Sequence, residues 1–433
     1  MSQCNVICLA IDRLHVGYLG AYGNTWIRTP ALDRLAAESF VLDRATIDSP
    51  ALAIQYHSLW LGRHALCHEH PAIGRPSLAE QFNVAGFHSV LVTDEPIVAE
   101  HALALQFSDR VVISSNARRV SADVAASTEE TDAAQFFAAA CEWLDSARSP
   151  FFLWLHTGIL GQIWDAPLEF RKQYTDEEDP APQRWADVPN RLLPEKFDPD
   201  ELLAMTHAYA GQVTLVDHLI GSFLEVLDEM GLSSTTLLIG FSPRGFPLGQ
   251  HRRVGPCDEA IYGELAHVPW MLRFPAGKRV TERCQSLVQP ADLYATILDV
   301  CGLGPGGQVA GGKIAAGEGR SLAPLVRGEA AWNFDRACII GASRQRGIIV
   351  PAWSLRLSEY ELQGAAVESA TQQTRAELFA KPDDWFEVNE VSDRCPEIVQ
   401  QLEATFTAFS EAGQAGVPAE PATLPMELME GIE

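Results

Sequence analysis

The sequence predicts an α/β fold: a doubly wound, mostly parallel sheet with helices on both faces, followed by a small C-terminal α+β domain. Three observations support this. Short apolar runs of strand length alternate with longer helical patterns along most of the chain. The 433 residues, 47% of them hydrophobic, provide enough apolar material for a large core. After about residue 320 the pattern changes to shorter β-like segments.

The first strand is expected at Asn5–Ile11, a continuous apolar run of the kind found in buried parallel strands. Asp12 follows this run directly. Because open α/β sheets bind their ligands at the carboxyl ends of the strands, Asp12 is predicted to lie at a ligand site.

Two helices with clear start signals are expected next, at residues 30–40 and 51–61. Each is preceded by a hydroxyl side chain and a proline, which together are typical of a helix N-terminus. Thr29 and Ser49 are therefore predicted to cap these helices.

The rest of the main domain continues the same alternation. Further strands are expected at residues 89–93, 151–156, 235–241 and 268–274. Further helices are expected at residues 80–85, 131–147, 202–230 and 291–301. Two segments are expected to be surface loops because one is acidic and contains prolines and the other is rich in glycine: residues 164–199 and 302–319.

A domain boundary is predicted near Trp332, which gives a main domain of residues 1–332 and a smaller domain of residues 333–413. The smaller domain is expected to contain β-segments at 337–342 and 347–357 and a helix at 396–409. Residues 414–433 contain prolines and acidic side chains and are expected to form a loose tail.

Composition excludes several classes of protein. The formal net charge of -25 argues against nucleic acid as a partner, because it repels phosphate. The nine cysteines are scattered and include no C-x-x-C pair, which favours a reducing compartment over a disulfide framework or a zinc site. The chain shows no secretory signal and no apolar run near the ~18 residues of a membrane span. We therefore expect a cytoplasmic location and no membrane partner.

Several short motifs are weak individually but specific in their order and spacing. They are Ile11-Asp-Arg-Leu, Tyr18-Leu-Gly-Ala-Tyr-Gly, Thr29-Pro-Ala-Leu-Asp-Arg-Leu-Ala, Gly62-Arg63, Trp164-Asp-Ala-Pro, Val268-Pro-Trp, Gln289-Pro-Ala-Asp-Leu-Tyr, Gly319-Arg-Ser-Leu and Glu377-Leu-Phe. On these motifs the chain resembles the arylsulfatase-like sulfatases of the alkaline phosphatase superfamily, from the first strand nearly to residue 410.

The resemblance implies a divalent cation, usually calcium, held by carboxylates, and an aldehyde hydrate made from a Cys or Ser that attacks the sulfate ester. The cation would neutralise the sulfate oxygens and lower the pKa of the nucleophile. Calcium takes about six to eight oxygen ligands. Asp12 matches one of them and is the only ligand that the alignment retains.

The position of the family's nucleophile pattern can be recognised, but its reactive residues are replaced. Leu52 stands where the C-x-P-x-R pattern carries its nucleophile, and Tyr56 replaces the arginine. Leucine cannot attack sulfur, so no catalytic residue is expected here. Ser49 is a remote substitute nucleophile, with His57 or His251 as its base, although a serine before proline usually caps a helix.

The metal ligands are replaced in the same systematic way. Arg13 stands where many sulfatases have a second aspartate, and Pro243 and Arg244 occupy the ligand positions of the D-H-G or D-N-G pattern. In this alignment Gly161 replaces a histidine and Asp94 replaces a lysine. Fixed cations beside a calcium ion would repel it. No metal is therefore expected, and calcium or magnesium would bind only if the family site were retained.

Two arginines carry the charge of the lost cation and present planar donors that suit sulfate, phosphate or carboxylate groups. This pattern predicts a metal-free site for an anionic small molecule or a sulfated sugar, formed by Arg13, Arg244, Asp12 and His251. The alternative is that one arginine pairs with Asp12 and fills a cleft that has lost its function.

The leading hypothesis is therefore a pseudoenzyme that lacks formylglycine-dependent hydrolysis of sulfuric esters and binds an anionic ligand. Two other hypotheses stay open. One is an active sulfuric or phosphoric ester hydrolase with a non-standard site. The other is a non-catalytic assembly subunit, for which a homo-oligomer would be the sign.

Overall fold

A computed structural model describes ten segments of the chain: residues 4–67, 75–114, 123–256, 261–275, 281–304, 318–329, 338–342, 344–361, 372–415 and 424–430. These fall into two compact units, each built from several stretches of sequence. The first unit comprises Met1–Asp43, Pro76–Cys257 and His267–Gln285, and the second comprises Arg44–Arg75, Asp258–Ala266 and Ser286–Glu433. Trp332, where the domain boundary is predicted, lies outside the described residues.

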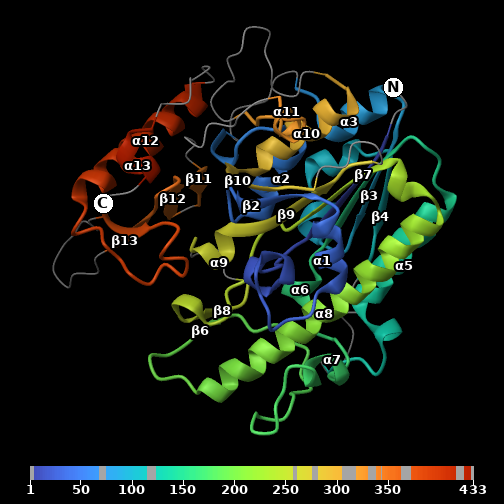
Figure 1. The fold of residues 1–433 in the computed structure, drawn as a ribbon, viewed down its shortest axis with the longest axis horizontal. Helices are drawn as coiled ribbons and strands as arrows, with labels where there is room; N and C mark the ends of the chain where they lie inside the picture. The colour runs from blue at the N-terminus through green and yellow to red at the C-terminus, as the bar shows by residue number, and fades with distance from the viewer. Residues whose placement is uncertain are drawn as a thin grey trace. The chain divides into compact units, whose positions relative to one another are not determined.

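The large sheet has eight strands in the order β10-β2-β9-β7-β1-β5-β3-β4 (Figure 1). Their bounds are β1 Asn5–Ile11, β2 Phe40–Thr46, β3 His88–Thr93, β4 Asp109–Val112, β5 Phe151–Thr157, β7 Thr236–Phe241, β9 His267–Arg273 and β10 Arg283–Val288. The pairs β7-β1, β1-β5, β5-β3 and β3-β4 are parallel, whereas β9 runs antiparallel to β7. The predicted doubly wound, mostly parallel sheet is confirmed.

Strand β1 lies inside the sheet, and all seven of its residues are buried. Burial on both faces explains why its sequence is continuously apolar and does not alternate. On one face its odd-numbered residues join a core cluster with residues of α1 Pro30–Ala37, α5 Asp132–Ser146 and α8 Pro199–Glu229. The long helix α8 contacts α1 and α5, and Figure 1 shows it running beside α5.

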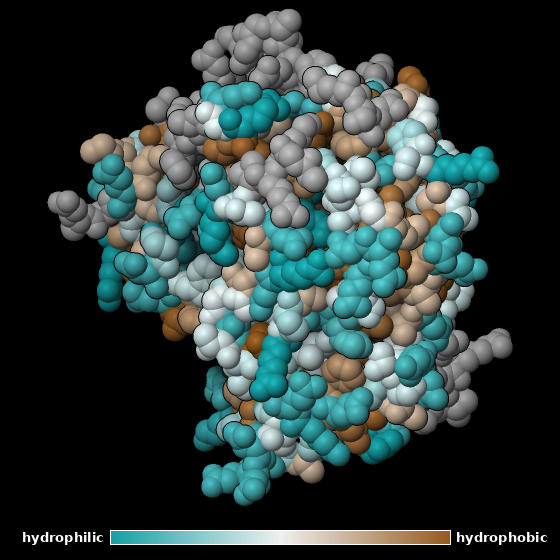
Figure 2. All heavy atoms as spheres, turned by 45° about the vertical axis from the view of Figure 1, so that its right-hand side comes forward, coloured by the Kyte–Doolittle hydropathy of each residue, from teal (hydrophilic) through white to brown (hydrophobic). Residues whose placement is uncertain are grey.

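Most of the other helices are short. In the first unit they are α3 Leu78–Val84, α4 Pro96–Ala99, α6 Ile159–Gln162 and α7 Leu168–Lys172. In the second unit they are α2 Leu52–Leu61, α9 Gly263–Ala266, α10 Pro290–Cys301 and α11 Ala323–Val326. No helix among the described residues combines the length and the apolar character needed to cross a bilayer. Hydrophilic residues cover much of the face in Figure 2, with smaller hydrophobic areas between them.

The predicted cap Thr29 is the N-cap residue of helix α1, but its side chain makes no capping hydrogen bond. Asp217 of α8 supplies the missing acceptor: its carboxylate accepts from the backbone N–H of Leu32 at 2.8 Å and of Ala31 at 3.1 Å. The Asp217 side chain is buried. A carboxylate at this position satisfies two N-terminal donors and interacts favourably with the helix dipole.

We expect Asp217→Ala to lower the free energy of unfolding by about 1–3 kcal/mol, because it removes the acceptor of one buried and one partly buried backbone donor. Urea denaturation at neutral pH measures this loss. Asp217→Asn keeps one acceptor oxygen and should therefore lie between the wild type and the alanine variant. Equal stability of all three proteins would contradict this role of Asp217.

Several predicted elements have different bounds in the structure, and some strands were not predicted. The helix expected at 30–40 ends at Ala37, and Phe40 begins β2, which was not predicted. The loop expected at 164–199 contains α7 and the short strand β6, Arg191–Leu192, which pairs with β8, Arg253–Val254. Strands β4 and β10 were also missed.

The second unit contains an antiparallel sheet in the order β11-β12-β13-β14 and the long helix α12. Their bounds are β11 Cys338–Gly341, β12 Gln345–Ile349, β13 Trp353–Glu361, β14 Gln372–Ala380 and α12 Pro396–Ala415. The single β-segment predicted at 347–357 is therefore a hairpin. The predicted loose tail is wrong for residues 424–430, because α13 Met426–Glu430 packs with Leu428 fully buried.

Candidate functional site

The carboxyl ends of four neighbouring strands of the first unit bring the predicted polar residues together. Asp12 and Arg13 follow β1, Arg244 follows β7 shortly after its end, and Asp94 follows β3. His156 lies near the end of β5 and pairs in register with Ala10 of β1. Because these strands are parallel, their ends lie at one edge of the sheet, where this fold places its ligands.

Asp12 and Arg244 form a buried, two-point ion pair. Arg244 donates from Nε to Oδ1 of Asp12 at 3.1 Å and from Nη2 to Oδ2 at 2.5 Å. The two residues are only 2% and 6% exposed. Nε of Arg13 lies 3.9 Å from Oδ2 of Asp12, so two guanidinium groups flank one carboxylate. This fork geometry is the strong form of an arginine–carboxylate interaction.

The charges of this cluster follow from burial and from the arginines. Burial raises the pKa of Asp12, but the attraction of Arg244 and Arg13 outweighs it and lowers the pKa to about 2. Burial lowers the pKa of His156 to about 4, since the pull of Asp12 is opposed by Arg244. At neutral pH, Asp12 is therefore an anion and His156 is uncharged.

The backbone around Arg13 is held in an unusual conformation. Arg13 has a φ of 67°, in the left-handed region that non-glycine residues seldom adopt. The hydroxyl of Tyr209 donates to the carbonyl oxygen of Arg13 at 2.7 Å and accepts from the backbone N–H of His15 at 2.9 Å. The Ser242 hydroxyl donates to the carbonyl oxygen of Arg244 at 2.6 Å. These buried bonds fix both arginine-bearing segments.

Arg13 also occupies space that a side chain at residue 161 would need. A Cβ atom on Gly161 would lie 2.9 Å from Cγ of Arg13, closer than real Cβ atoms approach another atom. The alignment places a histidine of the sulfatases at this position. Arg13 in its present position and a histidine at residue 161 are therefore incompatible without a shift of one of them.

Asp94, which stands where the alignment expects a lysine, is a buried carboxyl. Its Oδ2 accepts from the Thr157 hydroxyl at 2.6 Å and its Oδ1 from the backbone N–H of Gly158 at 2.7 Å. Burial raises the pKa of Asp94 to about 7, although both hydrogen bonds lower it. Asp94 is thus an acidic group that titrates near neutral pH.

This shift gives a pH dependence of stability. The pKa of Asp94 is about 7 in the folded chain and about 3.9 in the unfolded chain. The folded state therefore binds more protons between pH 4 and 7, and Asp94 makes stability fall as pH rises through that window. We expect Asp94→Asn to flatten this fall in urea denaturation at stepped pH. Asp145→Asn, at an exposed helix position, is the control, and identical slopes for both variants would contradict the assignment.

The nucleophile cassette belongs to the second unit. Leu52 and Tyr56 on α2 are 2% and 0% exposed, and the Tyr56 ring packs edge-on against Trp60 with centroids 4.4 Å apart. Both side chains are therefore inaccessible to solvent.

The prediction that Ser49 caps helix α2 is wrong. The N-cap of α2 is Ala51, which makes no side-chain bond, and the Ser49 hydroxyl instead accepts from the backbone N–H of Ala51 at 3.2 Å. Ser49 is buried in a turn before the helix. The two histidines considered as its base lie in different units, His57 on α2 and His251 on the turn Gln250–Arg252.

The donor set at the sheet edge does not fit the calcium ion of the sulfatases. Asp12 already binds Arg244, Pro243 has no side-chain donor, and Arg13 and Arg244 are cations. Within the described part of the chain, no group of three His, Cys, Asp or Glu side chains has the arrangement needed for a metal ion. Calcium requires several oxygen ligands together.

Some residues of this cluster were not predicted from the sequence. His156 carried a usable signal, since it ends an apolar run at the sheet edge where ligands bind. Tyr209 carried none, because its partners are backbone groups of residues nearly 200 positions away. Ser242 bonds the nearby carbonyl oxygen of Arg244 and also the distant backbone N–H of Leu14. The predicted site residue His251 lies on a turn with a φ of 49°.

Comparison with known proteins supports the resemblance seen in the motifs. The sequence model of the family named Sulfatase matches residues 4–303. The endo-4-O-sulfatase of Bacteroides thetaiotaomicron is 27% identical over 208 residues, which are 45% of this chain and 39% of that protein. An arylsulfatase of Clostridium perfringens is 23% identical over 363 residues, covering 68% of this chain and 74% of that protein.

Solved structures show the same fold. The phosphonate monoester hydrolase of Agrobacterium radiobacter superposes with a TM-score of 0.74 at 15% identity, covering 95% of this chain and 96% of that one. An enzyme in complex with its substrate D-glucosamine-2-N,6-O-disulfate superposes with a TM-score of 0.73 at 14% identity, covering 96% and 99%.

Proposed function

The chain belongs to the sulfatase family, and we propose that it is a pseudoenzyme that does not hydrolyse sulfuric esters by the metal-dependent mechanism of the family. One observation carries the proposal: the aligned metal ligand Asp12 is bound on both oxygens by Arg244 in a buried pair. A calcium ion would have to displace this guanidinium and then lie beside a second one, Arg13. Breaking a buried ion pair in this way is strongly unfavourable.

The residue at the nucleophile position of the family supports the same conclusion. Leu52 has no heteroatom, and it is buried in the second unit. A sulfatase needs both an activated nucleophile and a charge that stabilises the sulfate oxygens. Here one is replaced by a hydrocarbon and the other by an internal ion pair.

Elemental analysis of protein desalted from a calcium-containing buffer tests the proposal. We expect far less than one calcium or magnesium ion per chain. Assays with aryl sulfate, aryl phosphate and aryl phosphonate esters should give the buffer rate, and Asp12→Asn should leave that rate unchanged. Stoichiometric metal, or turnover that disappears in the Asp12 variant, would instead establish a hydrolase with a non-standard site.

Anion binding is a second candidate function, favoured by the charges of the cluster. Arg13 and Arg244 bring two guanidinium groups next to Asp12, and His156 is neutral. The planar donor groups of arginine suit sulfate, phosphate and carboxylate groups. A sulfated sugar is consistent with the neighbour that was solved with a disulfated glucosamine.

Calorimetric titration separates anion binding from a closed cluster. Glucosamine-6-sulfate, inorganic phosphate and acetate should release heat with the wild type, and Arg13→Met should weaken the binding. Absence of heat with all three compounds would leave the Asp12–Arg244 pair as a purely structural element.

A cytoplasmic location is part of the same proposal. Eight of the nine cysteines lie in the described part of the chain, and no disulfide joins any two of them, which suits a reducing compartment. Fractionation of cells that express the full-length natural protein tests this, and recovery of the protein outside the cytoplasm would refute it.

A further inference from the structure

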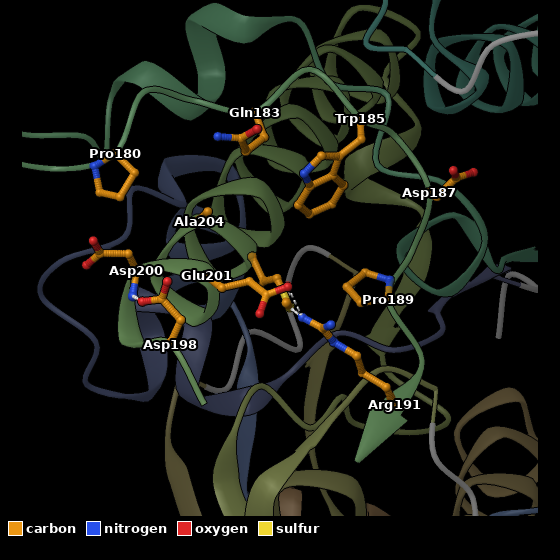
Figure 3. Close-up of a pocket in the computed structure, with 11 residues that line it drawn as sticks. Pro180, Gln183, Trp185, Asp187, Pro189, Arg191, Asp198, Asp200, Glu201 and Ala204 are labelled. Atoms are coloured by element: carbon orange, nitrogen blue, oxygen red, sulfur yellow. Dashed lines mark hydrogen bonds and ion pairs between the residues drawn. The ribbon is translucent and has the colours of Figure 1, made fainter. Parts of the chain in front are cut away.

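A pocket of about 570 Å³ lies in the first unit, between the segment around residues 180–191 and the first turns of α8 (Figure 3). No residue of the Asp12 cluster lines it, so an inference from this pocket does not depend on the proposed function. Its volume is in the range of pockets that bind small molecules.

The charge of the pocket lining is strongly negative. Four acidic residues line it, Asp187, Asp198, Asp200 and Glu201, whereas Arg191 is its only basic residue. Three negative charges therefore remain after Arg191 is counted, which disfavours an anion such as a sulfated sugar and favours a cation. Acidic side chains alone are common on a chain with a net charge of -25, so the other walls of the pocket decide what it can bind.

The second feature is an apolar wall. Figure 3 shows the indole of Trp185 extending into the space above the pair formed by Arg191 and Glu201. Met205 and Pro189 add apolar surface to the lining. The ring of Trp185 packs against the ring of Trp164 with centroids 5.9 Å apart, which holds it in place. A fixed aromatic ring next to carboxylates is the usual environment of a bound organic cation.

The third feature is a guanidinium that already occupies part of this space. Nη2 of Arg191 donates to Oε1 of Glu201 at 2.5 Å and lies 3.9 Å from the sulfur of Met205 (dashed lines in Figure 3). The side chains of Arg191 and Glu201 are 43% and 52% exposed. Ion pairs with this exposure contribute little to stability, so a competing cation can replace Arg191 at small cost.

We propose that this pocket binds a small organic cation that carries a guanidinium or ammonium group. The cationic head binds the Glu201 carboxylate in place of Arg191, and the alkyl part packs against Trp185 and Met205. Nearby Asp198 and Asp200 add attraction without a fixed contact. The internal Arg191 acts as a competitor that lowers the affinity for external cations.

Butylguanidinium and its neutral isostere butylurea test the proposal by isothermal titration calorimetry at physiological ionic strength. Butylguanidinium should bind with one site per chain, and butylurea should give no heat. Glu201→Gln should weaken butylguanidinium binding about tenfold or more, because it removes the carboxylate that receives the head. Arg191→Ala should strengthen it several-fold, because it removes the internal competitor.

Matched variants separate the pocket from the overall charge of the protein. Glu225→Gln makes the same charge change on α8, about 36 Å along the helix from Glu201. Arg34→Ala makes the same change as Arg191→Ala at an exposed ion pair on α1. Both controls should leave the affinity within about twofold of the wild type. Absence of binding, equal binding of the urea, or equal effects of the Glu201 and Glu225 variants would each overturn the proposal.

Discussion

Asp12→Asn is expected to lower the free energy of unfolding by about 3–5 kcal/mol, as measured by urea denaturation at neutral pH. The substitution keeps the shape of the side chain but removes its charge, so Arg244 and Arg13 lose the carboxylate between them. Arg244 and Arg13 are nearly inaccessible to water. Removal of a negative charge that lies beside two buried guanidiniums accounts for the size of the loss.

A double-mutant cycle with Arg244→Met isolates the pair from other effects of the two substitutions. The double variant should lose clearly less than the sum of the two single losses, because it removes both charges together. The exposed pair of Arg34 and Asp228 is the control, and Asp228→Asn should cost less than about 1 kcal/mol. If Asp12→Asn cost no more than this control, the buried pair would not be what holds the sheet edge together.

The lowered pKa of Asp12 also makes the free energy of unfolding depend on pH. Its pKa is about 2 in the folded chain and about 3.9 in the unfolded chain. The unfolded state therefore binds more protons in this interval, and the stabilisation by Asp12 is complete above pH 4 and lost as the pH falls towards 2. Asp12→Asn should remove this acid dependence, in the opposite sense to the effect expected for Asp94→Asn.

The sequence predicts best those elements whose signal is local and continuous. Strand β1 was placed at its observed bounds because both of its faces are buried, so its apolar run is uninterrupted. Strand β2 was missed because Asp43 and Arg44 interrupt its apolar run, and its N-terminal part was taken as the end of helix α1. Such a strand is specified by its neighbours in the sheet, which lie far away in the sequence.

The site could be predicted in part. Asp12, Arg13 and Arg244 were expected to lie together, because parallel strands end at one edge of a sheet. Which arginine would bind Asp12 was not predictable, since the left-handed backbone of Arg13 directs its side chain towards Gly161, while Arg244 forms the two-point pair. The backbone of Arg13 depends on a bond from Tyr209, 196 residues away, which no local sequence pattern predicts.

Arg171→Met is the other substitution for which we expect a loss of about 3–5 kcal/mol. Arg171 on α7 is 1% exposed and donates to three carbonyl oxygens: those of Trp164 at 2.5 Å, Gln183 at 2.6 Å and Trp185 at 2.9 Å. Burial lowers its pKa to about 10 despite the attraction of Asp123 and Asp165. The guanidinium is thus a charged group whose main function is to satisfy the backbone of the segment that folds around it.

Methionine fills a similar volume but donates no hydrogen bond to these three carbonyl oxygens, and a buried unsatisfied group such as that of Trp164 costs about 1–3 kcal/mol. Arg191→Met, at an exposed arginine whose partner Glu201 is also exposed, should cost less than about 1 kcal/mol and is the control. Gly211→Ala should act in the same direction as Arg171→Met, because its Cβ would lie 2.9 Å from Cγ of Arg171.

Since Arg171 also fixes the backbone of Trp185 and stacks on its ring, Arg171→Met should weaken binding of butylguanidinium. Unchanged stability and unchanged binding together would show that the segment is held by its other contacts.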